Sequence, residues 1–139
     1  MQCYTQTEIV NELTALKTLV AAGSLHLTKS NFTPAAGLTA AILDAIEADY
    51  DGYAAVNTTA VLDIYSQGNN SWAFQVATIQ FNYGPAAVPP VTNMIYGFYV
   101  KSAAGDVIYS ATLPNPFPMV DTLSGLPIDL LFSRSANPF

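Results

Sequence analysis

Apolar residues near the start of the chain recur at the spacing of an α-helix. Four of them follow at steps of four, three and four residues and so share one helix face: Ile9, Leu13, Leu16 and Val20. Just before this stripe, Thr5 and Glu8 have the spacing of a capping box, in which the two side chains satisfy free backbone N–H groups. Gly23 follows the stripe and is expected to end the helix in a left-handed cap.

This stripe needs an apolar partner, because a helix of about four turns is marginal in water by itself. The partner is either the chain's own domain or another subunit on which the helix docks. We take Ile9, Leu13, Leu16 and Val20 as candidate interface residues, and divide the chain into an N-terminal helical arm over residues 1–24 and a domain over residues 25–139.

A second, shorter helix is predicted between a strand-like segment and a segment of turn residues. Residues 25–28 alternate as in a strand, and Thr33 and Pro34 have the pattern of an N-cap followed by proline at the first helical position. The residues after them at helical spacing form a short stripe: Leu38, Ile42 and Ile46. Turn residues at 49–53 then end this pattern.

From Gly52 onward the chain has the pattern of β-strands. Residues 53–65 are rich in Val, Ile, Thr and Tyr and predict a strand, which a turn at 66–70 ends. Large apolar residues then take even positions up to Val76 and odd positions from Ile79. This change of parity predicts a bulge or bend near Ala77.

Further alternation predicts three more strands in the last third of the chain. Residues 94–100 and 107–113 flank a hairpin turn at 103–106, and residues 128–132 close the chain. The prolines between them mark an exposed edge or a loop: Pro114, Pro116 and Pro118. The fold expected from all of this is mainly β, an antiparallel β-sandwich (jelly-roll-like or immunoglobulin-like) with an N-terminal amphipathic helix and a second short helix.

Charge narrows the classes of partner. Only 10% of the residues are charged, against about 25% in an ordinary soluble domain, and the net charge is −6. The four basic residues are scattered: Lys17, Lys29, Lys101 and Arg134. Nucleic acids and anionic membranes are bound by clustered cations, so neither is expected as a partner. The 51% apolar content instead predicts a protein that hides part of its surface in an assembly.

Cysteine and the first residues bear on the cellular compartment. Cys3 is the only cysteine, which excludes an internal disulfide and argues against a cysteine-based zinc site. The first eight residues have neither the basic start nor the apolar run of a signal peptide, and no apolar run approaches the ~20 residues of a membrane span. The expectation is synthesis in a cytoplasm with a free thiol.

Few residues offer chemistry. His26 is the only histidine, and between Leu25 and Leu27 it is expected to be a surface or hydrogen-bonded structural residue rather than a catalytic base. Three nearby carboxylates are the best candidates for a hard cation, but they are better explained as turn residues: Glu47, Asp49 and Asp51. No catalytic, cofactor-binding or metal-ligating residue is predicted.

The aromatic residues have two possible roles. The eight tyrosines and the single tryptophan could form a platform for stacking on sugars. Trp72, Phe74 and Phe98, however, fall at strand positions expected to face the core. Core packing is therefore the preferred interpretation.

Five short motifs follow one another from residue 25 onward: LHL at 25–27, NFTP at 31–34, EADYDGYA at 47–54, YGFYV at 96–100 and AG at 104–105. In these motifs the chain resembles a group of small uncharacterised β-sandwich proteins encoded by tailed bacteriophages and phage-like contigs. The likeness covers about four fifths of the chain. Residues 1–24 are an addition to this pattern, and residues 111–114 lack the charged residues associated with that strand.

The resemblance implies a virion-associated structural protein with no enzymatic activity and no catalytic residues. The expected function is that of a capsid-decorating (cement) or other minor virion protein, made in the host cytoplasm and located on the virion. Its partner would be the major capsid protein or another virion protein, and a homo-oligomer with closed symmetry, by analogy a trimer, is expected. The alternative is a receptor- or glycan-binding module of a tail or fibre. A small hydrolase is a third hypothesis, which the shortage of histidine disfavours.

Overall fold

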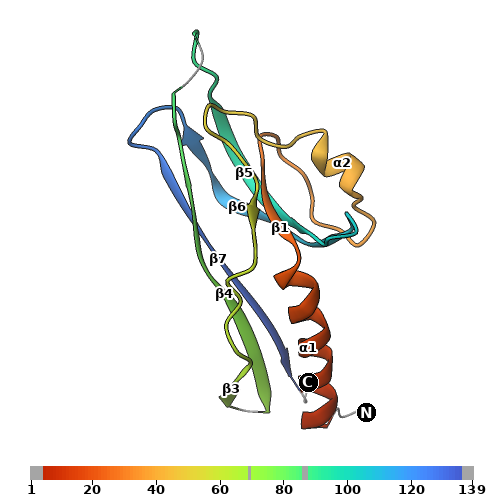
Figure 1. The fold of residues 1–139 in the computed structure, drawn as a ribbon. Coiled ribbons are helices and arrows are strands. Elements are labelled where there is room, and N and C mark those ends of the chain that lie inside the picture. Colours follow the sequence, from red (N-terminus) through yellow and green to blue (C-terminus); the bar gives the residue numbers. More distant parts are fainter. Residues whose placement is uncertain (1–4, 69, 86–87, 136–139) are drawn as a thin grey trace.

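A computed structural model describes residues 5–68, 70–85 and 88–135, which form two antiparallel sheets and two helices (Figure 1). Helix α1 comes first and the strands follow it, with α2 between the first two. The elements are α1 (Gln6–Ala21), β1 (Ser24–Thr28), α2 (Ala40–Asp44), β2 (Val56–Asn57), β3 (Tyr65–Gly68), β4 (Ser71–Asn82), β5 (Asn93–Lys101), β6 (Val107–Met119) and β7 (Gly125–Ser135).

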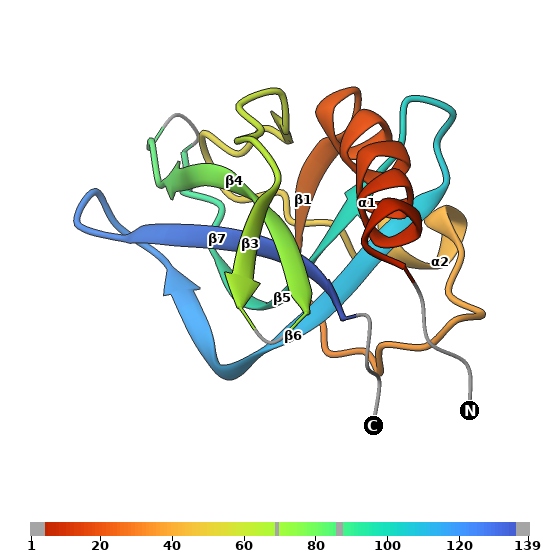
Figure 2. The same ribbon diagram turned by 90° about the horizontal axis from the view of Figure 1, so that it is seen from below.

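The strands form a sandwich-like pair of sheets. One sheet has the order β2-β1-β5-β6 and the other the order β3-β4-β7, and every strand pair is antiparallel. Buried side chains from β1 and β5 on one side, and from β4 and β7 on the other, belong to one apolar core. The sheets are not closed into a barrel (Figure 2). The predicted fold class is confirmed: mainly β and antiparallel, with two helices.

The apolar face of α1 lies inside this core. Ile9, Leu13 and Val20 are at most 1% exposed, and Leu16 is partly buried against them. Helix α1 contacts β4 and β7, and it lies beside the part of these long strands that the four-stranded sheet does not reach (Figures 1 and 2). The four candidate interface residues are therefore not an exposed docking surface. Of the two partners considered, the stripe packs on the chain's own domain, and residues 6–21 share one core with the sheets.

Both ends of α1 show why the chain turns there. The predicted capping box is present, since the Thr5 hydroxyl accepts from the Glu8 N–H at 3.2 Å and the Glu8 carboxylate accepts from the Thr5 N–H at 2.7 Å. The predicted left-handed cap at Gly23 is wrong, because Gly23 has no positive φ. A Cβ there would instead lie 2.3 Å from the backbone oxygen of Lys101, so close packing against β5 favours glycine.

The second helix is shorter and later than predicted. It begins at Ala40 after the N-cap Thr39, and not at Pro34. Leu43 is buried while Ile42 is 52% exposed, so the expected stripe is wrong as well. With five residues the helix has little more than one turn. Leu43 packs into the protein, and a helix this short has too few turns to form a repeating apolar stripe.

Residues 53–65 do not form the predicted strand. Val56–Asn57 pairs with β1, and an isolated bridge joins Val61 to Val76 of β4. Tyr65 begins β3, which also includes residues 66–68 of the predicted turn. The chain passes here from the four-stranded sheet to the three-stranded one. Residues 53–65 are therefore divided between β1 and β4, and each pairing within this segment is short.

The bulge near Ala77 is confirmed, since the register of β4 against β7 shifts between Val76 and Ile79. A second shift, not predicted, lies between Ile95 and Gly97 of β5. Ile95 and Val100 both lie in the core and Met94 is 42% exposed, although alternation places Met94 and Val100 on one face. Between the two pairings β6 runs from Thr112 to Phe117 while β5 runs only from Gly97 to Ile95, so the extra residues lie on β6.

The hairpin and the proline-rich edge also follow expectation. Gly105 has φ +91°, as such a turn requires, and the Ser102 N–H donates to the Asp106 backbone oxygen at 2.8 Å. Strand β6 includes the three prolines Pro114, Pro116 and Pro118, and it is the edge of its sheet.

Candidate functional site

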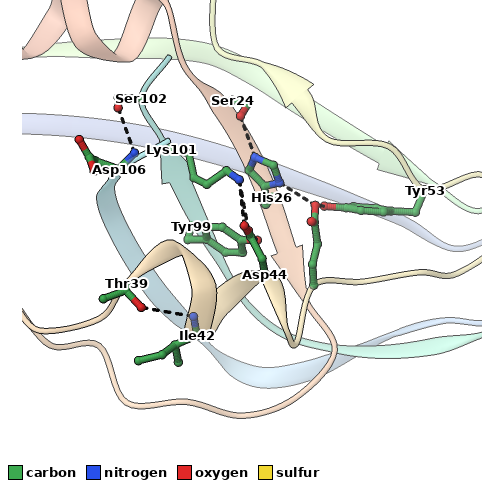
Figure 3. A network of polar contacts seen from close by, with 11 residues as sticks. Ser24, His26, Thr39, Ile42, Asp44, Tyr53, Tyr99, Lys101, Ser102 and Asp106 are labelled. Atoms are coloured by element: carbon green, nitrogen blue, oxygen red, sulfur yellow. Dashed lines mark hydrogen bonds and ion pairs between the residues drawn. The ribbon is translucent and has the colours of Figure 1, made fainter. Parts of the chain in front are cut away.

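The polar side chains that come closest together lie on the outer face of the four-stranded sheet. Ser24, His26 and Thr28 of β1 lie opposite Lys101, Tyr99 and Gly97 of β5 in the antiparallel register. Alternate residues of a strand share a face, and Leu25 and Leu27 face the core. Asp44 of α2 points at Tyr99 and Lys101 (Figure 3), and Glu47, just after α2, contacts His26.

His26 links two of these residues through its two ring nitrogens. Nδ1 lies 2.6 Å from Glu47 Oε2, and Nε2 lies 2.7 Å from Ser24 Oγ. A carboxylate only accepts hydrogen bonds, so Nδ1 donates to Glu47, and when Nε2 carries no proton it accepts from the Ser24 hydroxyl. The ring stacks on Tyr99 with centroids 4.9 Å apart and is 7% exposed, which fixes its orientation. The prediction of a hydrogen-bonded histidine is confirmed.

Glu47 is held in place from two sides. The Tyr53 hydroxyl donates to Oε2 at 2.6 Å and itself accepts from the Leu27 N–H at 3.1 Å. Backbone pairing of the neighbouring residues, such as Ala48 N–H with the Leu27 oxygen at 2.9 Å, fixes the main chain beside β1. Burial, together with the hydrogen bond to Glu47, raises the pKa of Tyr53 well above its usual value, so this phenol stays a donor.

A second carboxylate lies next to the first pair. Asp44 accepts from the Tyr99 hydroxyl at 2.5 Å and from Lys101 Nζ at 3.1 and 3.3 Å. Burial raises the pKa of Asp44, but the hydrogen bonds from Tyr99 and Lys101 lower it by more, so the net shift is downward. Burial and Asp44 raise the pKa of Tyr99. These bonds attach α2 to the outer face of the sheet.

The Tyr99→Phe variant tests this attachment. Losing the donor should cost about 1 kcal/mol at pH 7, at the low end for a bond to a charged group because the Asp44 side chain is 40% exposed. The lowered pKa of Asp44 gives stability that is present above its ordinary value of 3.8 and is lost as the pH falls through the folded-state value. Urea unfolding between pH 7 and pH 2 should show the variant and the natural chain converging at low pH. A difference that is equal at both ends would contradict the assignment.

The three carboxylates considered for a cation do not converge. Glu47 contacts His26, whereas Asp49 pairs with Lys29 Nζ at 2.7 Å and Asn93. The hydrogen bonds from Lys29 and Asn93 lower the pKa of Asp49. Asp51 is buried and accepts from the Val91 N–H at 3.2 Å. In the described ranges no three His, Cys, Asp or Glu side chains form a group that could hold a metal ion. Cys3 lies outside the described residues.

The aromatic residues proposed for the core are found there. Phe74 is fully buried, and Trp72 and Phe98 are partly buried against the core cluster. Phe74 also stacks on Phe132 of β7, with centroids 5.1 Å apart. These rings are therefore used in packing between the sheets.

Four of the exposed apolar side chains lie on two loops at the opposite end of the sandwich from α1. We call them the end-loop residues; they come from the β4–β5 and β6–β7 connections and are Val88, Val91, Val120 and Leu123. Val88 and Leu123 are 99% and 94% exposed. A bond from the Tyr83 N–H to the Ser124 oxygen and the pairing of Asn93 with Met119 bring the two loops to the same end (Figure 1).

Sequence reasoning singled out His26 and Glu47 but did not pair them. Ser24 could have been found, since it is two residues before His26 in a strand and therefore shares its face. Glu47, Tyr53 and Tyr99 are distant along the chain, and only the fold brings them together.

No helix in the described part of the chain is long and apolar enough to cross a membrane. No family model, curated protein or solved structure matches this chain.

Proposed function

We propose that this chain is a structural protein of a tailed-phage virion, a capsid-decorating or other minor virion protein that acts through protein–protein contacts. The observation that carries the proposal is the set of end-loop residues, large apolar side chains exposed at one end of a chain with 10% charged residues. Exposed apolar side chains mark an interaction site when they form one contiguous patch, so the proposed contact requires the two loops to present these four side chains together. The resemblance to phage proteins supplies the setting.

The end-loop residues suit a contact that is repeated many times. Each buried Å² of apolar surface contributes roughly 25 cal/mol, so a few side chains give weak affinity per copy. A lattice of identical sites compensates through its number of contacts. The partner in this proposal is the major capsid protein or another virion protein. A homo-oligomer, with a trimer as the first candidate, would present several such ends together.

The glycan-binding alternative has less support. Stacking on sugars needs exposed aromatic faces that lie together. Trp72 and Phe98 pack against the core, and the exposed Tyr65 and Tyr109 lie on strands of different sheets, β3 and β6. This separation favours a role in protein contacts.

Virion composition tests the proposal. In particles of a phage that carries this gene, quantitative mass spectrometry should find the chain at tens of copies or more. The double variant Val88→Ser with Leu123→Ser should lower that copy number at least tenfold, because it removes the two end-loop side chains that are most exposed.

Leu131→Ser is the matched control, since Leu131 is 54% exposed on β7 but lies away from the end loops. It should be incorporated like the natural chain. Absence of the natural chain from the particles would overturn the proposed function. Unchanged incorporation of the double variant would overturn the assignment of the end loops.

A further inference from the structure

We propose that Ser24 is a nucleophile, activated by His26, that accepts the acyl group of small activated esters. This inference goes beyond the structural role and does not depend on it. It rests on the three-residue chain Ser24–His26–Glu47, in which each side chain contacts the next at hydrogen-bonding distance (Figure 3).

The connectivity is that of a serine–histidine–acid triad. In such triads the serine hydroxyl donates to one imidazole nitrogen while a carboxylate accepts from the other, which keeps the free lone pair aimed at the serine. Here Ser24 Oγ is 2.7 Å from Nε2 and Glu47 Oε2 is 2.6 Å from Nδ1. Both the atoms and their order along the chain of contacts agree with that template.

The base is rigidly placed. Stacking on Tyr99 and a 7% exposed ring restrict the rotation of the His26 imidazole. Glu47 is a positioning residue, and Tyr53 holds it through the bond at 2.6 Å. Pre-set geometry of this kind is what lets a general base act on a weak nucleophile.

Ser24 itself is half-buried, in contrast to the enclosed histidine, and polar residues flank it. In the sheet register Ser24 lies opposite Lys101 on one side and Asn57 on the other, so all three share the outer face. The exposed Asn57 amide is a donor that suits a developing oxyanion, whereas Lys101 Nζ is held by Asp44 at 3.1 Å. Because Ser24 is only half-buried on a strand face, we expect it to accept small, reactive acyl groups.

The reaction balances with water as the only co-reactant. Ser24 Oγ attacks the ester carbonyl carbon while its proton passes to His26 Nε2, and the carbon–oxygen bond to the leaving phenol or alcohol breaks. That leaving group takes the proton from His26. Water, deprotonated by the same nitrogen, then releases the acid and restores Ser24.

The experiment uses the full chain with p-nitrophenyl acetate and a fluorophosphonate probe, followed by peptide mass spectrometry. Ser24 is expected to carry the phosphonyl group, and Ser24→Ala should abolish both the labelling and the ester turnover. His26→Gln, which keeps polar atoms but no base, should slow labelling about 100-fold or more. Ser110→Ala is the matched control, because Ser110 shares this sheet face opposite Tyr99, is also half-buried and should leave labelling unchanged.

Glu47→Gln separates positioning from folding. It should slow labelling about tenfold and shift the pH midpoint of the rate, whereas a merely structural role would leave the pH profile unmoved. Thermal melts of each variant report whether the fold persists. Ser24→Ala removes only one hydroxyl group and is therefore the variant expected to disturb the fold least. Labelling of Ser24 no faster than that of Ser110, or an unchanged rate in folded His26→Gln, would overturn the inference. Neither result bears on virion incorporation.

Discussion

Leu13→Ala is expected to lower the free energy of unfolding by about 3 kcal/mol, within the usual range of 2–5 for a buried leucine. Leu13 is 0% exposed and belongs to the cluster between α1 and the two sheets. The substitution removes apolar contacts and leaves a cavity that the long strands β4 and β7 close only in part. Urea unfolding followed by circular dichroism measures the change.

Leu19→Ala on the same helix is the control. Leu19 is 50% exposed, so its loss should change the free energy of unfolding by about 0.5 kcal/mol or less. If α1 were instead an arm that docks on a neighbour, Leu13→Ala would weaken assembly and spare the stability of the single chain. Equal effects of the two substitutions would contradict the packing described above.

Gly97→Ala is expected to destabilise the chain by about 3 kcal/mol, at the upper end for overpacking. A Cβ at this position would meet the backbone oxygen of Ala111 at 2.4 Å and the Phe32 ring at 2.8 Å. The first contact is with main chain of the paired strand β6, which has little room to move. Strand β5 would therefore have to shift against both neighbours.

Gly37→Ala is the matched change for this prediction, because a Cβ at Gly37 has no atom within 4 Å. Its unfolding midpoint should stay close to that of the natural chain. Thermal melts of the two variants side by side provide the measurement. A Gly97→Ala chain as stable as the Gly37→Ala chain would mean that β5 and β6 lie farther apart than described.

Local signals in the sequence account for the elements that were predicted well. The capping box at Thr5 and Glu8 needs only two residues three apart. The bulge in β4 follows from a change of parity between Val76 and Ile79, which shows directly in the order of apolar residues. Such features depend only on residues that are close together in the sequence, so they can be recognised without knowledge of the fold.

Predictions that depended on distant partners fared worse. The α1 stripe was visible, but whether it faced β4 and β7 or another subunit was not. Residues 53–65 favour strands, yet the pairing partners divide them between two sheets. The shift in β5 near Gly97 follows from its pairing with β6 and leaves no change in apolar parity.

The same distinction applies to the site. Alternation placed His26 on the face opposite Leu25 and Leu27, which is correct. Its acid partner Glu47 is 21 residues away and comes from a segment whose path across the sheet has no local signature. Glu47, Asp49 and Asp51 lie close in sequence but contact three different groups. Glu47 contacts the His26 ring, Asp49 pairs with Lys29, and Asp51 accepts from a backbone N–H.

The prolines of β6 limit how copies of this chain can join. Pro114, Pro116 and Pro118 stand at alternate positions along the outermost strand, and each lacks the amide hydrogen that a neighbouring strand would need. A strand of a second molecule would lack three hydrogen-bond donors along this half of β6, so strand pairing cannot extend the sheet there into a continuous ribbon. Polymers built by main-chain zippering are thereby disfavoured at this border, and molecules that meet along it must recognise each other through side chains.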